Sequence, residues 1–351
     1  MTAAKHDTQE GARILGAIDI GTSSIRLVIG QAFPDGHWEV LERLQRTVRL
    51  GQDTFQRGRL RMATMRSAVA ILRDYRELLD TYGVAEVRAV ATSSIREAAN
   101  GETFIDRVLM ATDIDVSLIG VAEESRLTIA AVRQAVATQL KDRKNALVVQ
   151  VGGGNTILTL LAKGKIKACQ SLPMGPIRSQ EVLATTTEHA DKAAKLIHHQ
   201  VSSTLSAFSN LLPLRRIQTF IVLGADARWF ASTLTTAPDT FDSVTITRTR
   251  FDTLVGKCQR QSPEKLTKKF GLSFVDAESL VASLLIHQGL LHATAAKKMI
   301  IPGVSMLDGL FIEMTGTGAL DDSFTQQVFQ SALTIGEKYG CHVDHATQVM
   351  E

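Results

Sequence analysis

The sequence predicts an α/β protein built from two related halves, and three observations support this fold class. Residues 17–29 and residues 146–161 share a layout of strand, glycine-containing turn and strand. Aligning Asp19 with Gln150 also aligns Gly21 with Gly152, about one domain length further along the chain. Strands alternate with helices in both halves, which is typical of mixed sheets covered by helices. We therefore expect a mixed five-stranded sheet in each half and a cleft between the halves.

The composition fits a globular chain and argues against several classes of function. The 351 residues are enough for two domains at about 150 residues per domain. No apolar run approaches the ~20 residues of a membrane helix, and the polar N-terminus is unlike a secretory signal, so we expect no membrane partner. Three dispersed cysteines give no disulfide framework and favour the cytoplasm. A net charge of +3 is too small to indicate nucleic acid, and a homodimer is left open.

The first element is a hairpin, in which an apolar run leads to Asp19, a turn of small residues follows at 21–24, and a second apolar run returns. Such a turn offers backbone N–H groups and hydroxyls to an anion, and Asp19 at the strand end can hold a cation. An ordinary hairpin with Asp19 as a turn former explains this stretch alone equally well. The second copy of the pattern favours a phosphate held between the halves.

The rest of the first half alternates regularly. Seven arginines at 43–66 form a basic stretch, a helix follows from Met65 to a C-cap at Gly83, and residues 87–91 form a short strand. That strand leads to a cluster of hydroxyls and one arginine at 92–96, which suits either an anion site or a plain N-cap. A strand at 116–119 closes this half. A helix is expected from Glu123 to about Leu140, and spacing alone assigns Glu124 no role.

The second half repeats the scheme after its glycine hairpin. Apolar residues at 197–212 recur at helical spacing, a buried strand at 220–223 ends in a turn at Gly224, and residues 284–296 are helical. A final strand is expected at 299–303. His287 and His292 fit a core or surface position better than a ligand position.

These stretches together resemble the exopolyphosphatase and guanosine-pentaphosphate phosphatase (Ppx/GppA) family over residues 14–316. The motifs that carry the resemblance are Ala-Ile-Asp19-Ile-Gly-Thr-Ser-Ser-Ile-Arg-Leu, Val-Arg49-Leu-Gly, Ala-Thr-Ser-Ser-Ile-Arg96-Glu-Ala-Ala-Asn-Gly, Glu123-Glu124-Ser-Arg-Leu, Gly152-Gly-Gly-Asn-Thr and Ser-Leu-Pro-Met-Gly175. The resemblance implies two actin-like (RNase H-like) domains, at 12–141 and 142–316. Residues 317–351 resemble the start of the helical C-terminal domain of longer members.

The same resemblance implies a function and a set of site residues. The family removes the terminal phosphate of inorganic polyphosphate, or the 5′ γ-phosphate of guanosine pentaphosphate, with Mg²⁺ or Mn²⁺ and water. By position, Glu124 would activate the water, and Asp19 and Gln150 would handle the metal. The residues implied to cradle the phosphoryl group are Gly21, Thr22, Ser23, Ser24, Arg49, Ser93, Arg96, Gly152, Gly153, Gly154, Asn155 and Thr156.

Departures from the family pattern keep alternatives open. Most members have an Asp and a Glu where this chain has Gln150 and Ile157, so two acids expected near the metal are missing. A hydrolase with altered metal handling is the leading hypothesis. The alternative is an impaired member that binds polyphosphate or a nucleotide as a sensor. A sugar or acetate kinase of the same fold fits the motifs less well.

Overall fold

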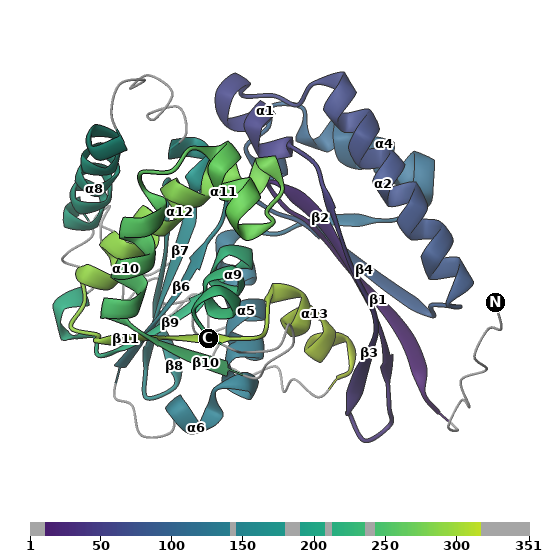
Figure 1. Ribbon diagram of the computed structural model, residues 1–351. Coiled ribbons are helices and arrows are strands. Elements are labelled where there is room, and N and C mark those ends of the chain that lie inside the picture. The colour runs from purple at the N-terminus through teal and green to yellow at the C-terminus, as the bar shows by residue number, and fades with distance from the viewer. Residues whose placement is uncertain (1–10, 141–144, 180–189, 208–212, 236–242, 317–351) are drawn as a thin grey trace, which may run out of the picture.

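A computed structural model describes residues 11–140, 145–179, 190–207, 213–235 and 243–316, and it contains two mixed sheets flanked by helices (Figure 1). The expected fold class is therefore confirmed. The expected helical tail at 317–351 and the expected domain boundary at 141/142 lie outside the described residues.

The first sheet has five strands in the order β3-β2-β1-β4-β5. The first three strands pair as antiparallel hairpins, and β4 and β5 run parallel to β1. The strands are β1 (Arg13–Ile20), β2 (Ser24–Ala32), β3 (Trp38–Thr47), β4 (Glu86–Ala91) and β5 (Val116–Leu118).

Helices cover both faces of this sheet, so β1 is apolar from Ile14 to Ile18. Ile18 and Ile20 pack toward α2 (Met62–Thr81) and α4 (Gly101–Thr112), whereas Leu15 and Ala17 pack toward α5 (Val121–Ala135) and α13 (Met306–Met314). Alternate residues of a strand point to opposite faces, which explains the division. Two short helices, α1 (Leu50–Arg57) and α3 (Ser93–Arg96), complete this first lobe at one end of the sheet.

The second sheet has six strands in the order β10-β11-β9-β6-β7-β8, so the expectation of five strands in this half is wrong. The additional strand, β10, pairs antiparallel with β11 at the sheet edge. It has five residues, of which Ile246 alone is buried, so its sequence pattern is weak. The strands are β6 (Asn145–Val151), β7 (Thr156–Ala162), β8 (Lys165–Leu172), β9 (Thr219–Leu223), β10 (Ser243–Thr247) and β11 (Lys298–Pro302).

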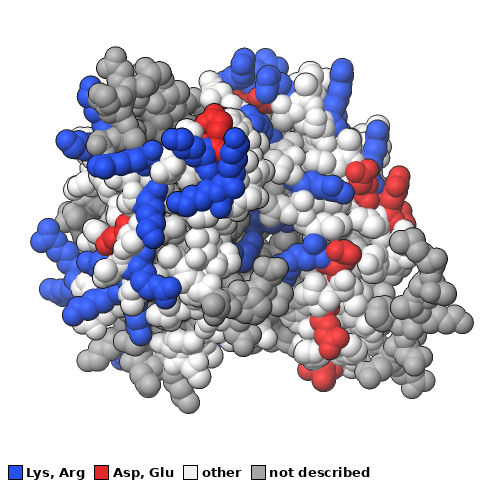
Figure 2. Space-filling model, in the orientation of Figure 1, with Lys and Arg blue, Asp and Glu red and all other residues white. Residues whose placement is uncertain are grey.

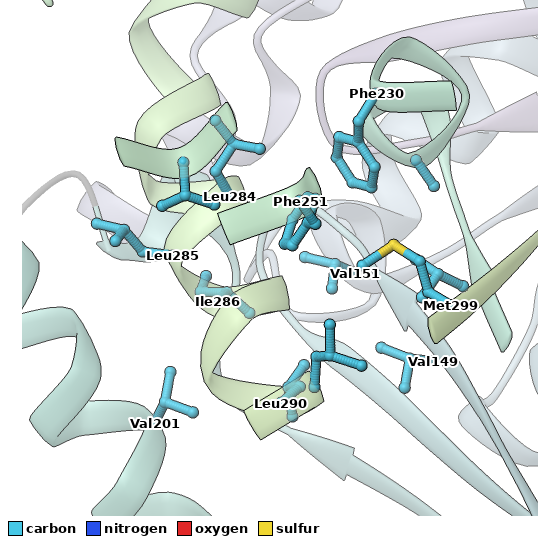
Figure 3. Packing of buried hydrophobic residues seen from close by; sticks show 14 of the residues in the cluster. Val149, Val151, Val201, Phe230, Phe251, Leu284, Leu285, Ile286, Leu290 and Met299 are labelled. Atoms are coloured by element: carbon cyan, nitrogen blue, oxygen red, sulfur yellow. The ribbon is translucent and has the colours of Figure 1, made fainter. Parts of the chain in front are cut away.

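The largest core cluster lies in this second lobe, around α12. Figure 3 shows Leu284, Ile286 and Leu290 of α12 among side chains from β6, α9 and α10. α12 starts earlier than the sequence indicates, at a Ser273 cap whose hydroxyl accepts from Asp276 N–H. The helices of this lobe are α8 (Ala190–Ala207), α9 (Ala225–Leu234), α10 (Arg248–Cys258), α11 (Pro263–Phe270) and α12 (Phe274–His292), with the short α6 (Ala137–Leu140) and η1 (Leu214–Arg216).

α12 is also the one helix in the described part of the chain that is long and apolar enough to cross a membrane by length and composition. More than half of its apolar window, 56%, is buried inside the protein. Its position in the core accounts for that apolarity.

The two hairpins are equivalent in hydrogen bonding as well as in sequence. Gly21 N–H donates to Ser24 O over 3.0 Å, and Gly152 N–H donates to Asn155 O over 2.8 Å. Asp19 lies opposite Arg26 on β2, and Gln150 lies opposite Ile157 on β7. Each leading strand also has a parallel neighbour on its other side, β4 for β1 and β9 for β6.

The two lobes are tied together by helices that pack on the opposite lobe. α5 contributes Ile129 and Val132 to a core beneath the second sheet, and α13 packs Phe311 onto the first sheet against Trp38, with ring centroids 4.6 Å apart. These helices lie between the two sheets in Figure 1. They cross where Gly309 of α13 faces the backbone of Leu127.

This crossing gives a test of the fold. A Cβ on Gly309 would lie 1.8 Å from Leu127 O, so Gly309→Ala should lower the free energy of unfolding by about 2–3 kcal/mol in urea denaturation. Gly256→Ala in α10 is the matched control, because a Cβ there meets nothing within 4 Å. It should be neutral or stabilising by up to about 1 kcal/mol, since alanine favours helix. If both substitutions changed the free energy of unfolding equally, α13 would not approach the backbone of α5 at Gly309.

Candidate active site

A cavity of about 130 Å³ lies between the lobes, where the two glycine turns meet. Most of the residues expected at the phosphate and metal site line it: Asp19, Gly21, Thr22, Ser23, Ser24, Ser93, Glu124, Gln150, Gly152, Gly153 and Asn155. The wall is completed by residues from the start of α9, the start of α12 and the start of α13. A larger groove between α8 and α12 has neither glycine turn in its wall.

The two turns approach as closely as their side chains allow. A Cβ on Gly153 would lie 2.6 Å from Thr22 Cγ2, so only glycine at this position permits the approach. Gly51 allows the same methyl group to pack against α1, since a Cβ there would lie 1.9 Å from it. Thr22 therefore lies between glycines of both lobes, and the turn amides from the two lobes lie around one cavity.

Beside these turns, a second contact between the lobes joins Phe55 to Gly154 and Arg178. Phe55 of α1 packs against Gly154, where a Cβ would lie 1.9 Å from the ring. The Arg178 guanidinium lies 4.4 Å from the centroid of this ring, donates to Gly154 O over 2.8 Å and donates to Glu97 over 2.6 Å. Arg178 thus links the second turn to two elements of the first lobe.

Glu124 is placed in the cavity by the first turn of α5 and is only 7% exposed. Gln150 Nε2 donates to Glu124 Oε1 over 2.9 Å, and the Thr128 hydroxyl donates to Gln150 Oε1 over 2.8 Å. Glu124 Oε2 is buried and has no hydrogen-bond partner in the structure. One carboxylate oxygen is therefore fixed by the protein, and the other is left for a ligand or water.

The pKa of Glu124 is raised to about 7, first by burial and then by the neighbouring Asp19 carboxylate, against the opposing charges of Arg96 and Arg26. A carboxyl group with a pKa near neutrality can accept a proton efficiently at working pH. Burial also raises the pKa of Asp19, and the Arg26 guanidinium, 3.8 Å away, lowers it.

Arg26 was not expected at the site, although it stands in the first motif. Its guanidinium lines the cavity, and its Nε is buried without a partner. The hairpin register places it directly opposite Asp19. The strand pairing could have been predicted from the length of the turn at 21–24, and it would have placed Arg26 beside Asp19, because cross-strand partners point to the same face.

Asp226 also lines the cavity and was missed. Its carboxylate accepts from the Ser283 hydroxyl over 2.5 Å, and burial raises its pKa. The position of Asp226 in the sequence could have predicted it, because Asp226 comes just after β9, the parallel neighbour of the strand that carries Gln150. Residues at the carboxyl ends of adjacent parallel strands meet at one sheet edge.

Four expected residues do not line the cavity. Arg49 is 43% exposed at its side chain and lies 3.4 Å from Glu278 of α12. The Thr156 hydroxyl is buried and donates to Met174 O, and Gly154 faces Phe55. Arg96 donates to Ile119 O over 2.7 Å, although its charge still lowers the pKa of Glu124.

The donors present fit a divalent cation that is shared with a phosphate ligand. Among the described residues, no group of three His, Cys, Asp or Glu side chains could hold a metal. Mg²⁺, however, commonly binds through about one or two carboxylates together with substrate phosphates, and Asp19 offers one carboxylate in the cavity. The Glu124 carboxyl group lines the same cavity, with its Oε2 unpartnered. Gln150 lies beside them, but its amide oxygen already accepts from Thr128.

The chain is similar in sequence to one protein family and to named members of it. A model of the Ppx/GppA phosphatase family matches residues 28–317. The chain is 27% identical to Exopolyphosphatase 1 of Mycobacterium leprae over 46% of this chain and 47% of that protein, so the match spans about half the length of that relative. It is 29% identical to Exopolyphosphatase 2 of Mycobacterium tuberculosis over 70% of this chain and 79% of that protein.

Two solved structures show the same fold. A Ppx/GppA family member from Aquifex aeolicus superposes with a TM-score of 0.72 at 23% identity, covering 88% of this chain and 99% of that one. An exopolyphosphatase from Cytophaga hutchinsonii superposes with a TM-score of 0.79 at 21% identity, covering 87% and 98%.

The coupling between the two carboxylates can be measured directly. Asp19→Asn should lower the pKa of Glu124 below about 7, because it removes a negative charge that raises it. Carboxyl ¹³C NMR titration would give this value. Asp35→Asn, in the exposed turn between β2 and β3, is the control and should leave it unchanged. A Glu124 pKa that stays the same in both variants would show that the carboxylates do not interact.

Proposed function

The chain belongs to the Ppx/GppA phosphatase family, and on this premise we propose that it hydrolyses the terminal phosphoanhydride of inorganic polyphosphate or the 5′ γ-phosphate of guanosine pentaphosphate. The observation that supports this most directly is the unpartnered Oε2 of Glu124 in a cavity bounded by the two glycine turns. Phosphoryl transfer depends mainly on positioning and on neutralising charge, and this cavity offers both.

In the proposed reaction, water attacks the terminal phosphorus and the bond from phosphorus to the bridging oxygen breaks. Glu124 Oε2 takes the proton from the water, while Gln150 holds Oε1 in place. The amides and hydroxyls of the two turns bind the oxygens of the transferred phosphoryl group, and Arg26 offsets its charge. Because the pKa of Glu124 is about 7, the rate should rise as the pH increases through neutrality.

Mg²⁺ or Mn²⁺ completes the proposal. Asp19 would hold the ion together with the phosphates of the substrate. When bound, the ion would neutralise charge on the phosphates and on the leaving group.

The alternative is a sensor that binds the same ligands without hydrolysing them, and one observation favours it. Gln150 and its cross-strand partner Ile157 bring no charge to the positions where most family members have acids. A sensor should bind polyphosphate or guanosine pentaphosphate, yet release no phosphate at any concentration of Mg²⁺ or Mn²⁺. A phosphate-release assay with both substrates separates the two functions.

The role of Glu124 has its own test in that assay. Glu124→Gln should lower the rate of phosphate release by about 10²–10⁴-fold, because it removes the proton acceptor, and should leave substrate binding nearly intact. Glu123→Gln is the control from the same helical turn, since Glu123 is paired with Arg126. It should keep most of the activity. An unchanged rate in Glu124→Gln would remove the assignment.

A further inference from the structure

Lysine and arginine side chains gather on one face of the second lobe, outside the site described above. Figure 2 shows them over α10 and α11, with few acidic side chains between them. We call the exposed residues Lys257, Arg260, Lys265, Lys268 and Lys269 the basic face. The only acid at 257–271 is Glu264, in the first turn of α11, where its charge favours the helix dipole.

The fold accounts for only part of the basic face, because the helix dipole favours Lys257, Lys268 and Lys269 in the last turns of α10 and α11 but does not explain Lys265. α11 buries one residue, Leu266, and presents Lys265, Lys268 and Lys269 to solvent at helical spacings of three and four. Like charges at these spacings destabilise a helix by about 0.2–0.5 kcal/mol per pair. None of the three forms an ion pair with any residue that the structure describes, whereas Arg43 and Arg49 beside the cleft are paired with Asp308 and Glu278. A bound polyanion would relieve this repulsion.

The basic face begins where the interlobe cavity opens. α11 ends at Gly271 and leads directly into α12, whose first turns contribute Asp276 and Ser279 to the cavity wall. Gln45 of β3 lies on the wall that the first lobe supplies. A linear chain whose end lies at the two turns can therefore leave between β3 and α12 and pass along α11.

We propose that the basic face binds the part of a linear polyphosphate chain that extends out of the cleft. This inference rests on the proposed function and names its substrate class, because a linear polyphosphate continues as an unbroken row of phosphates, whereas guanosine pentaphosphate has a nucleoside after its three 5′ phosphates. Single-stranded nucleic acid fits less well, since base stacking needs free aromatic faces. The aromatic ring on α11, Phe270, already packs against Trp229 and lies under Lys269.

The experiment compares two triple variants with equal loss of charge. The test variant is Lys265→Gln, Lys268→Gln, Lys269→Gln. The control is Lys163→Gln, Lys165→Gln, Lys167→Gln, around the turn between β7 and β8, at the end of β7 opposite the cleft. All six lysines are exposed, so both variants should fold.

The test variant should bind long-chain polyphosphate at least about tenfold more weakly, and the slope of log Kd against log salt should fall by about two. Its KM for long chains should rise, while its KM and kcat for tripolyphosphate stay unchanged. The control variant should match the wild type. Equal weakening by both triples, or by neither, would overturn the proposal. Weakened binding of single-stranded RNA to the same extent as polyphosphate would overturn the assignment of the ligand.

The binding measurement separates this inference from the proposed function. If the wild type releases no phosphate, the hydrolase proposal fails, and the salt-dependent Kd values still decide whether the basic face binds the chain. If the wild type hydrolyses both substrates and the two triples behave alike, the inference about the basic face fails alone.

Discussion

The approach of Thr22 to Gly153 is the contact on which the rest of this structure depends. The turns come from different lobes, and any side chain at Gly153 would collide with Thr22 and Ile177. At this separation residues of both turns line one small cavity, and in the proposed function a single phosphoryl group accepts hydrogen bonds from both lobes there. Phe55, Gly154 and Arg178 hold the same arrangement at the rim. α5 and α13 fix it from below, because α5 packs against both sheets and α13, which follows the last strand of the second sheet, packs against the first.

The cavity concentrates ionisable groups that a protein interior disfavours. Asp19 and Glu124 are buried and Asp226 is half-buried, and the pKa values of all three carboxyl groups are raised. Close to the cavity, burial lowers the pKa of Arg228 to about 10. Arg26 and Arg43 add repulsion to Arg228. Ionisable groups with shifted pKa values cluster at functional sites more often than elsewhere, because catalysis and ligand binding require them there. Gln150 is the neutral member of this set, and it restrains Glu124 through a hydrogen bond without contributing charge.

Much of the fold could be predicted from the sequence, because the glycine hairpins and apolar strands are local patterns. The strand β10 could not, since it is short, lies at an edge and buries one residue. The motifs correctly placed Asp19, Glu124 and the two turns at the cavity wall. Arg49 was wrongly expected there, because it pairs with Glu278, a residue 229 positions away that no local pattern connects to it. Arg26 and Asp226 were missed because their place depends on strand register and on the order of strands in the sheet. The unpartnered oxygen of Glu124 also required coordinates, because it results from where Gln150 and Thr128 direct their hydrogen bonds.

The affinity of Gly153→Ala for tripolyphosphate, measured by titration calorimetry beside Gly256→Ala, tests most directly whether both turns bind one phosphoryl group. A Cβ at Gly153 would force Thr22 and the two turns apart, whereas a Cβ at Gly256 meets nothing within 4 Å. We expect that Gly153→Ala, measured at a temperature where it is folded by circular dichroism, binds at least about tenfold more weakly, which is about 1.4 kcal/mol, and that Gly256→Ala binds as the wild type does. Equal affinity in all three proteins would show that the phosphoryl group is not held between the turns.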